Sequence, residues 1–201
     1  MTRRASVGRP EVTSHGAIEQ AAFTLFRARG FEATTLDAIA EAVGVGRRTL
    51  FRYYRSKNDI PWGQFDRTLA GFREILENTP EGLDLYEAIG SGIVEFNRFP
   101  TEASPPHVER MRLILETPAL QAHSALRYGE WRQVIAEYAA ARLGVGADAL
   151  EPRLLGHVGL ALAMTAYEMW LDDPERSLTE LLTQSLTALS DQVGRGARSA
   201  R

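Results

Sequence analysis

The stretch from Phe31 to Asp59 reads FEATTLDAIAEAVGVGRRTLFRYYRSKND, and the order of its polar, apolar and glycine residues predicts two short helices joined by a tight turn. Thr35 is a typical N-cap residue, and apolar residues follow it at helical spacing. Gly44-Val45-Gly46 breaks that helix, and residues 47–54 predict a second one with Leu50 facing inward. The pattern is typical of a helix-turn-helix.

A third helix is predicted to begin directly after this motif. Ser56 can cap it, and Asp59 stands three residues later, where its carboxylate can complete a capping box. The second helix carries several cationic or polar side chains on its outer face. A short basic helix after a tight turn is suited to entering the major groove of DNA.

Residues 14 to 59 resemble the DNA-binding domain of the TetR family of bacterial transcriptional regulators. The resemblance rests on the pairs Gly30-Phe31, Thr34-Thr35, Ile39-Ala40, Gly44-Val45, Thr49-Leu50 and Ser56-Lys57. Residues 46–66, GRRTLFRYYRSKNDIPWGQFD, are also similar to regulators that accompany mycofactocin biosynthesis genes. The resemblance implies an all-α protein, with a three-helix DNA-binding domain at the N-terminus and a helical domain for ligand binding and dimerisation behind it.

Apolar periodicity along the rest of the chain predicts about nine helices in all and no strand pairing. Helices are expected from Ser14 to Arg29 and from Lys57 to about Asn78, and the last helix is expected to end near Val193. The predicted organisation is a flexible basic arm (1–12), the DNA-binding domain (13–57), the ligand-binding and dimerisation domain (58–193) and a disordered tail (194–201). The arm carries Arg3, Arg4 and Arg9, which either follow the minor groove or have no role.

The charge of the chain is unevenly distributed. Residues 1–57 contain ten Arg or Lys and five Asp or Glu, a balance of +5, whereas the whole chain of 201 residues carries −3. Residues 58–201 therefore carry −8. A basic N-terminal module on an acidic body is the charge distribution expected of a DNA-binding protein whose remaining surface is repelled by DNA.

The composition also bears on compartment and on metal chemistry. The chain has no cysteine, so disulfides and thiolate metal sites are excluded. We expect no metal and no cofactor, because the four histidines show no ligand spacing. No signal peptide and no membrane-spanning stretch are expected, which predicts a cytoplasmic protein.

The candidate DNA-binding residues lie in the helix-turn-helix and just after it. Arg47 and Arg48 stand in the first turn of the second helix, where arginine can donate two hydrogen bonds to guanine. The TetR resemblance extends a DNA-contacting role to Thr49, although Phe51 has no hydroxyl where the family usually has tyrosine. Phosphate contacts are expected from residues at helix N-termini and from the outer face. The predicted set is Thr35, Arg47, Arg48, Thr49, Phe51, Arg52, Tyr53 and Lys57.

The helical body is expected to bind a small-molecule effector. Its candidate lining is apolar and aromatic: Phe65, Phe96, Met111, Leu115, Trp131, Ile135, Met164 and Tyr167. The same residues are equally consistent with a filled core, and only the family resemblance favours a hollow one. The apolar lining favours an amphipathic effector such as a long-chain acyl-coenzyme A, with its phosphates near Arg110 or Arg127. The mycofactocin resemblance favours instead a redox or peptide-derived cofactor.

The last two long helices are the candidate dimer surface. The first offers small residues that permit close approach, and the second offers a leucine stripe, as expected for a four-helix bundle in a homodimer. The predicted interface is Gly156, Gly159, Ala163, Leu178, Leu182 and Leu186. The alternative is that both stripes pack inside one subunit.

Together these patterns predict a regulator, most simply a repressor, that binds a palindromic double-stranded DNA operator as a homodimer. An enzyme is not expected, because motifs such as HExxH and GxSxG are absent from the sequence. A protein–protein adaptor with a decayed helix-turn-helix is a third class. It would have lost the basic residues of the second helix and Lys57, the only lysine of the chain, and these are present.

Overall fold

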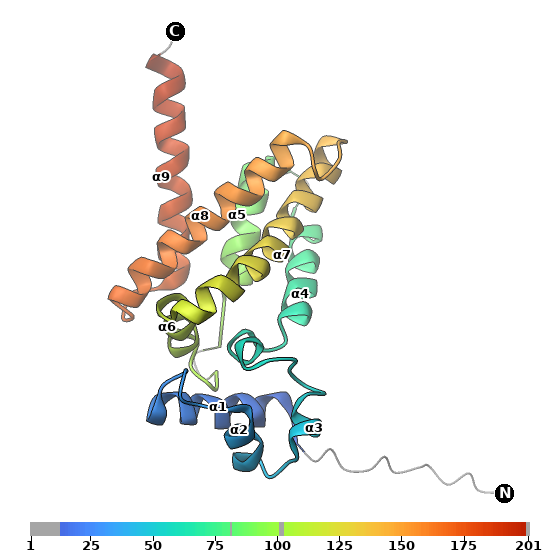
Figure 1. Cartoon of the computed structure of the whole chain (residues 1–201). Coiled ribbons are helices and arrows are strands. Elements are labelled where there is room, and N and C mark those ends of the chain that lie inside the picture. Colours follow the sequence, from blue (N-terminus) through green and yellow to red (C-terminus); the bar gives the residue numbers. More distant parts are fainter. Residues whose placement is uncertain (1–12, 81, 101–102, 200–201) are drawn as a thin grey trace, which may run out of the picture. The chain divides into compact units, whose positions relative to one another are not determined.

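The computed structural model describes residues 13–80, 82–100 and 103–199, and every regular element within these ranges is helical (Figure 1). The expectation of an all-α chain is confirmed, with nine α-helices and one 3-10 helix in the described ranges. The chain forms two compact units, residues 1–63 and residues 64–201. The basic arm expected at 1–12 lies outside the described residues.

The first unit contains the helices α1 (His15–Arg29), α2 (Leu36–Ala42) and α3 (Arg47–Leu50) and the 3-10 helix η1 (Lys57–Trp62). Each begins where the sequence provides a suitable residue, and Ser14, Thr35 and Ser56 use their side chains as caps. Apolar side chains from all four helices fill one core, which includes Ile18, Ala22, Phe23, Ile39, Leu50 and Ile60. The unit is therefore held together by burial between short helices that would be unstable alone.

The prediction of one helix from Lys57 to about Asn78 is wrong, because the structure has two helices in this segment. Residues 57–62 form η1, and α4 (Phe65–Glu77) begins only after Gly63. Gly63 has φ 60° and ψ −140°, a backbone conformation that is open to glycine and strained for other residues. Pro61 lies inside η1, where its missing N–H is compatible with a short 3-10 turn. The two compact units divide at this glycine.

The second unit contains α4 and the helices α5 (Leu85–Phe96), α6 (His107–Glu116), α7 (Pro118–Leu143), α8 (Leu150–Asp172) and α9 (Leu178–Ser199). Helices α7 and α8 lie side by side along most of their length (Figure 1). Pro118 opens α7 at its first turn, where no hydrogen bond from its nitrogen is needed, and the helix then continues without a break to Leu143. Gly144 ends it in the left-handed conformation.

Two glycines of α8 allow α7 to approach closely. A Cβ atom added at Gly156 would lie 2.7 Å from the backbone oxygen of Arg132, and one at Gly159 would lie 2.9 Å from Cδ1 of Ile135. Ile135 is fully buried in this contact. Packing within the subunit thus requires Gly156, which meets backbone, whereas Gly159 meets only the ends of isoleucine side chains.

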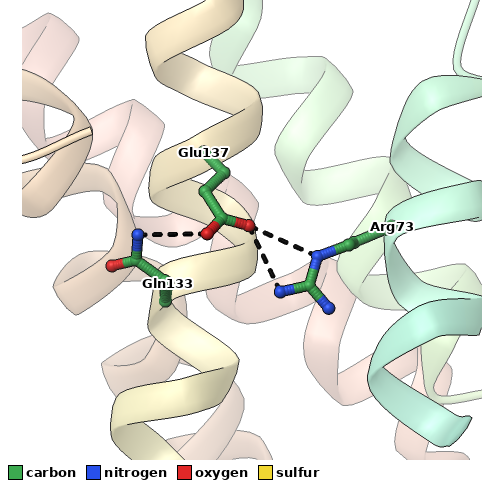
Figure 2. Close-up of polar contacts among 3 residues, drawn as sticks. All are labelled: Arg73, Gln133 and Glu137. Atoms are coloured by element: carbon green, nitrogen blue, oxygen red, sulfur yellow. Dashed lines mark hydrogen bonds and ion pairs between the residues drawn. The ribbon is translucent and has the colours of Figure 1, made fainter. Parts of the chain in front are cut away.

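Helix α4 is also joined to α7 by polar contacts. Arg73 donates hydrogen bonds from Nε and Nη2 to one carboxylate oxygen of Glu137, at 3.3 and 3.2 Å, and Gln133 donates to the other at 3.2 Å (Figure 2). Nearer the start of α4, the guanidinium of Arg127 lies 5.3 Å from the centre of the Phe65 ring. These contacts set the position of α4 on the body at two points along its length.

The C-terminal helix is longer than expected. Helix α9 continues to Ser199, whereas the sequence predicted a helix end near Val193 and a disordered tail at 194–201. Glycine in a helix costs roughly 1 kcal/mol relative to alanine, so Gly194 and Gly196 weaken this last part without a proline to stop it.

Helix α8 corrects the expectation that no stretch is long and apolar enough to cross a membrane. It has 23 residues, and a window of 18 of them has a mean hydropathy of 1.2, which meets the requirement by length and composition. Core helices of helical proteins meet the same requirement, and α8 packs against α7 and α9. Its composition is accounted for by that packing.

Candidate nucleic-acid interface

The helix-turn-helix is built by local hydrogen bonds around α2 and α3. The Thr35 hydroxyl accepts from the backbone N–H of Ala38 at 3.1 Å, as expected for an N-cap. Gly44 adopts φ 69°, and the N–H of Val45 after it donates to the carbonyl of Ala40 at 2.9 Å. Only glycine takes this conformation without strain, so the turn between the two helices depends on Gly44.

Helix α3 is shorter than the 47–54 segment expected to form it. Regular α-helix covers only Arg47–Leu50, and hydrogen-bonded turns continue the coil to Tyr54, whose N–H donates to the carbonyl of Leu50 at 3.1 Å. Leu50 and Tyr54 are buried, and the Tyr54 hydroxyl donates to a buried Glu19 carboxylate at 2.6 Å. These inward residues anchor the helix and leave its outer face free.

The outer face of α3 and of the turn after it presents three arginines to solvent. Arg48 and Arg52 are exposed and have no side-chain partner among the described residues. Arg47 is different, because its Nη1 lies 3.2 Å from Oδ2 of Asp37, on the first turn of α2. Thr49 lies beside them and is half-buried. The structure therefore brings the predicted base-contacting residues together on one short helix.

Phe51 lies on the same face with 42% of its surface exposed. Its ring is 5.4 Å from the guanidinium carbon of Arg47, which is within range of a cation–π interaction. An exposed aromatic ring beside free cations is suited to packing on a sugar or a thymine methyl.

Tyr53 and Lys57 are tied into the fold more than the sequence suggested. The Tyr53 hydroxyl donates to the backbone carbonyl of Thr13 at 2.8 Å. The Lys57 ammonium donates to the carbonyls of Phe31 at 2.6 Å and of Glu32 at 3.3 Å, and it lies 4.3 Å from the centre of the Phe31 ring. One of the three ammonium hydrogens of Lys57 is left for a phosphate.

Asp37 and His15 were not among the residues predicted for this site. In the sequence, Asp37 is an ordinary acidic residue of the first turn of a helix, where its negative charge interacts favourably with the helix dipole. His15 packs edge-on against the rings of Tyr53 and Tyr54, at 4.9 and 5.1 Å between centres. Both contacts link residues that are not neighbours in the chain, so no local sequence pattern predicts them.

The eight candidate effector residues all belong to the second unit, where each is buried or half-buried. Trp131 stacks on Phe72 at 5.2 Å between ring centres, and Phe96 packs on the same phenylalanine at 4.5 Å. Ile135, Trp131, Met111, Phe65 and Tyr167 are buried, and the remaining three are half-buried. A cavity of about 540 Å³ between α7 and α8 is lined by other residues, Arg132, Arg153 and His157 among them.

A polar chain inside this apolar region was not anticipated. The Tyr167 hydroxyl donates to Oδ1 of Asn97 at 2.6 Å, and Asn97 in turn donates to the carbonyl of Ile93 at 2.8 Å. Nε2 of His107 lies 2.8 Å from the same hydroxyl. Because the tyrosine proton is already used, His107 is assigned as the donor, which requires a proton on Nε2.

The environment of His107 favours that neutral form. Its ring stacks on Phe99 at 3.6 Å between centres. Burial, assisted by the charge of Arg110, lowers the pKa of His107 to about 3. Burial likewise raises the pKa of Tyr167 above its usual range, so this pair is uncharged at neutral pH.

The residues predicted for the dimer interface are covered within one subunit, which differs from the expectation. Gly156, Gly159 and Ala163 are buried, and the two glycines face α7 of the same subunit. Leu178 and Leu182 are buried as well, and Leu186 packs its side chain on Gly90 of α5. All six are at least half-buried within one subunit, because the small residues and leucines are the inward stripes of α8 and α9. The outward stripe of α8 is a different set: Leu150, Leu154, Ala161, Thr165 and Met169.

Comparison with known proteins agrees with this architecture. Residues 18–60 match the family described as bacterial regulatory proteins, tetR family, and residues 83–194 match the family described as MftR C-terminal domain. Among solved structures, Thermus thermophilus FadR in complex with lauroyl-CoA is similar with a TM-score of 0.57 and 26% identity, covering 88% of this chain and 93% of that one. A regulator from Syntrophomonas wolfei has a TM-score of 0.62 at 15% identity, covering 86% and 91%, which supports the fold alone.

Two relatives are similar along most of the sequence. A Mycobacterium tuberculosis protein that bears the name mycofactocin biosynthesis transcriptional regulator MftR is 42% identical over 196 residues, which cover 98% of this chain and 97% of the relative. The HTH-type transcriptional regulator TcmR of Streptomyces glaucescens is 32% identical over 156 residues, which cover 74% and 69%. With its helix-turn-helix and its body both matched, the chain belongs to the TetR family of bacterial transcriptional regulators.

Proposed function

We propose that this protein is a homodimeric repressor that binds a palindromic DNA operator and is released by an amphipathic small molecule. The observation that carries the proposal is the outer face of α3, where Arg48 and Arg52 are exposed and unpaired among the described residues. An arginine in this place can donate two hydrogen bonds to guanine, and the surrounding cations attract the DNA backbone. The protein acts in the cytoplasm and is not an enzyme.

The genes under control are proposed to be those of mycofactocin biosynthesis. The support is the 42% identity to the Mycobacterium tuberculosis protein named for that role, together with the MftR C-terminal domain match over residues 83–194. The similarity includes the body as well as the DNA-binding unit. It therefore supports a common effector class as well as a common target.

The effector is proposed to be a long-chain acyl-coenzyme A. Two observations support it: the candidate residues in the body are apolar and aromatic, and the similar Thermus thermophilus FadR was solved with lauroyl-CoA. An acyl chain would have to open space by displacing side chains such as Met111, Leu115 and Met164, next to Trp131. A redox or peptide-derived cofactor is the competing effector, which the mycofactocin similarity favours.

Release would occur by a shift of population. An acyl chain among α5 to α8 would favour one position of α4 on α7, which the Arg73–Glu137 pair now helps to set (Figure 2). Operator half-sites one turn apart require recognition helices about 34–36 Å apart. A changed position of α4 in each subunit would alter that separation and lower the affinity for the operator. An effector that bound both conformations equally would have no effect.

The test is a pair of titrations on the full-length dimer. Trp131 fluorescence should change as acyl-coenzyme A is added, and labelled operator DNA should be released over the same concentration range. The two curves must agree, because coupling between the sites is reciprocal. Free coenzyme A and mycofactocin-type redox cofactors serve as matched controls. If acyl-coenzyme A of several chain lengths changes neither signal, this effector class is wrong.

A further inference from the structure

Arg47 differs from Arg48 on α3 and from Arg52 in the turn after it, because its guanidinium is held from two sides. Asp37 of α2 accepts a hydrogen bond from its Nη1 at 3.2 Å, and the Phe51 ring lies 5.4 Å from its guanidinium carbon. Both charged side chains remain largely exposed, at 60% for Arg47 and 65% for Asp37. The pair is therefore on the surface that meets DNA and not in the core.

The ion pair has too little effect on stability to account for its position. Exposed pairs typically contribute about 0–1 kcal/mol, and many contribute nothing measurable. A carboxylate on a DNA-facing surface also repels phosphates, which lowers affinity for every sequence. Asp37 therefore adds little to folding and opposes DNA binding, unless it acts through Arg47.

The geometry gives it such a role. A guanidinium has five N–H donors, and Asp37 uses one edge of the group while the Phe51 face limits its tilt. The other N–H groups of Arg47 are left without a side-chain partner among the described residues. An arginine fixed in this way loses less conformational freedom when it donates two hydrogen bonds to a base.

We propose that Asp37 is a specificity-determining residue: it holds the Arg47 guanidinium in the orientation that reads one base pair, exchanging general DNA affinity for selectivity at that position. Asp37 makes no contact with the base in this arrangement and acts only as a positioning residue. The inference rests on the proposed DNA-binding function. It adds that the arginines of this surface differ in how selectively they contact bases. Arg48 and Arg52, which have no such support, would read with less selectivity.

The experiment measures binding of the full-length dimer to the operator, to operators changed at one base pair at a time, and to unrelated DNA. Asp37→Asn should bind unrelated DNA more tightly than wild type. Its preference at the base pair read by Arg47 should fall by about 3- to 10-fold, in the lower part of the range that coupled neighbouring residues show. In an Arg47→Ala background, Asp37→Asn should no longer change that preference.

The matched control is Glu41→Gln, which removes the same charge from an exposed position of α2 that has no contact with Arg47. It should raise affinity for all sequences without changing base preference. Thermal unfolding of each variant checks that the fold is retained. If Asp37→Asn and Glu41→Gln behave alike, or if Asp37→Asn lowers preference equally with and without Arg47, the inference is overturned. If wild-type protein does not select any operator, the DNA-binding function itself fails.

Discussion

The cationic residues near α3 have two different relations to the fold. Arg48 and Arg52 are free in solvent, whereas Lys57 holds the carbonyls of Phe31 and Glu32 with its ammonium. A free arginine can be removed with little effect on folding. Removal of Lys57 leaves two carbonyls without their charged donor, so it affects stability as well as DNA binding.

Arg48→Ala should weaken binding to the operator by roughly 1–3 kcal/mol and relax the preferred sequence, because a base-reading arginine carries sequence information. Lys57→Ala should weaken binding to all sequences, flatten the salt dependence and lower the melting temperature. Fluorescence anisotropy over a salt series, with thermal unfolding of both variants, checks these outcomes. A Lys57→Ala protein that altered base preference while Arg48→Ala did not would reverse the two assignments.

His107 gives a second prediction at this scale, which concerns pH. Its pKa in the folded protein, about 3, lies below the ordinary 6.5, so between these values the unfolded chain binds more protons than the folded one. The stability due to the neutral ring is complete above pH 6.5 and is lost as the pH falls toward 3. One such group contributes a slope of at most about 1.4 kcal/mol per pH unit.

The measurement compares denaturant unfolding of wild type and His107→Gln between pH 7.5 and 4.5. The advantage of wild type should shrink as the pH falls, because glutamine can donate to Tyr167 but does not titrate. The other three histidines are the same in both proteins, so the difference isolates His107. An advantage independent of pH would contradict the neutral buried ring.

At the scale of elements, the body depends on how closely α7 and α8 approach. Gly156 faces the backbone of α7, where no side chain can move aside to make room. Gly129 of α7 is also helical, but a Cβ added there would meet only a flexible Arg132 side-chain nitrogen at 3.8 Å. Gly156 therefore allows the close approach of α7 and α8, whereas Gly129 is not needed for it.

Gly156→Ala should destabilise the protein, by roughly 1–3 kcal/mol as for other overpacked sites. The reason is that the new Cβ would lie 2.7 Å from the Arg132 carbonyl oxygen. Gly129→Ala is the matched control and should be neutral or stabilising by up to about 1 kcal/mol, since alanine is the better helix former. Urea unfolding of the two variants decides the matter. Equal effects would show that the α7–α8 contact tolerates separation.

At the scale of the whole molecule, the proposed function requires two copies, and we propose the outward stripe of α8 as the surface that meets a partner subunit. Leu150 and Leu154 are 81% and 56% exposed, an unusual state for two leucines on one face of a helix. The inward leucines of α9 are already occupied, so a charge at Leu182 would unfold the subunit instead of separating two folded ones.

Leu154→Glu should convert the dimer into folded monomers with poor operator binding. Leu126→Glu is the control, because Leu126 is a similarly exposed leucine, at 70%, on a different helix, α7. It should leave the dimer intact. Sedimentation at micromolar concentration, with circular dichroism to check the helices, distinguishes the cases. Wild-type protein that sediments as a monomer would remove the basis for the proposed interface.

The sequence by itself determined those features of the protein that depend on residues close together in the chain. The Thr35 cap, the Gly44 turn and the Ser56–Asp59 capping box are local, so their residues alone predicted the helix-turn-helix. Apolar periodicity along the rest of the chain predicted the all-α class. The tertiary structure alone decided what depends on distant partners. Periodicity located the stripes of α8 and α9 but did not tell which stripe a neighbouring helix covers, so Gly156 and Leu182 were assigned to the wrong side. The Asp37–Arg47 pair, the Lys57 contacts and the His107–Tyr167–Asn97 chain join residues that are 10 to 70 positions apart. Contacts at such separations form only when the fold closes, because no local preference of the backbone encodes them.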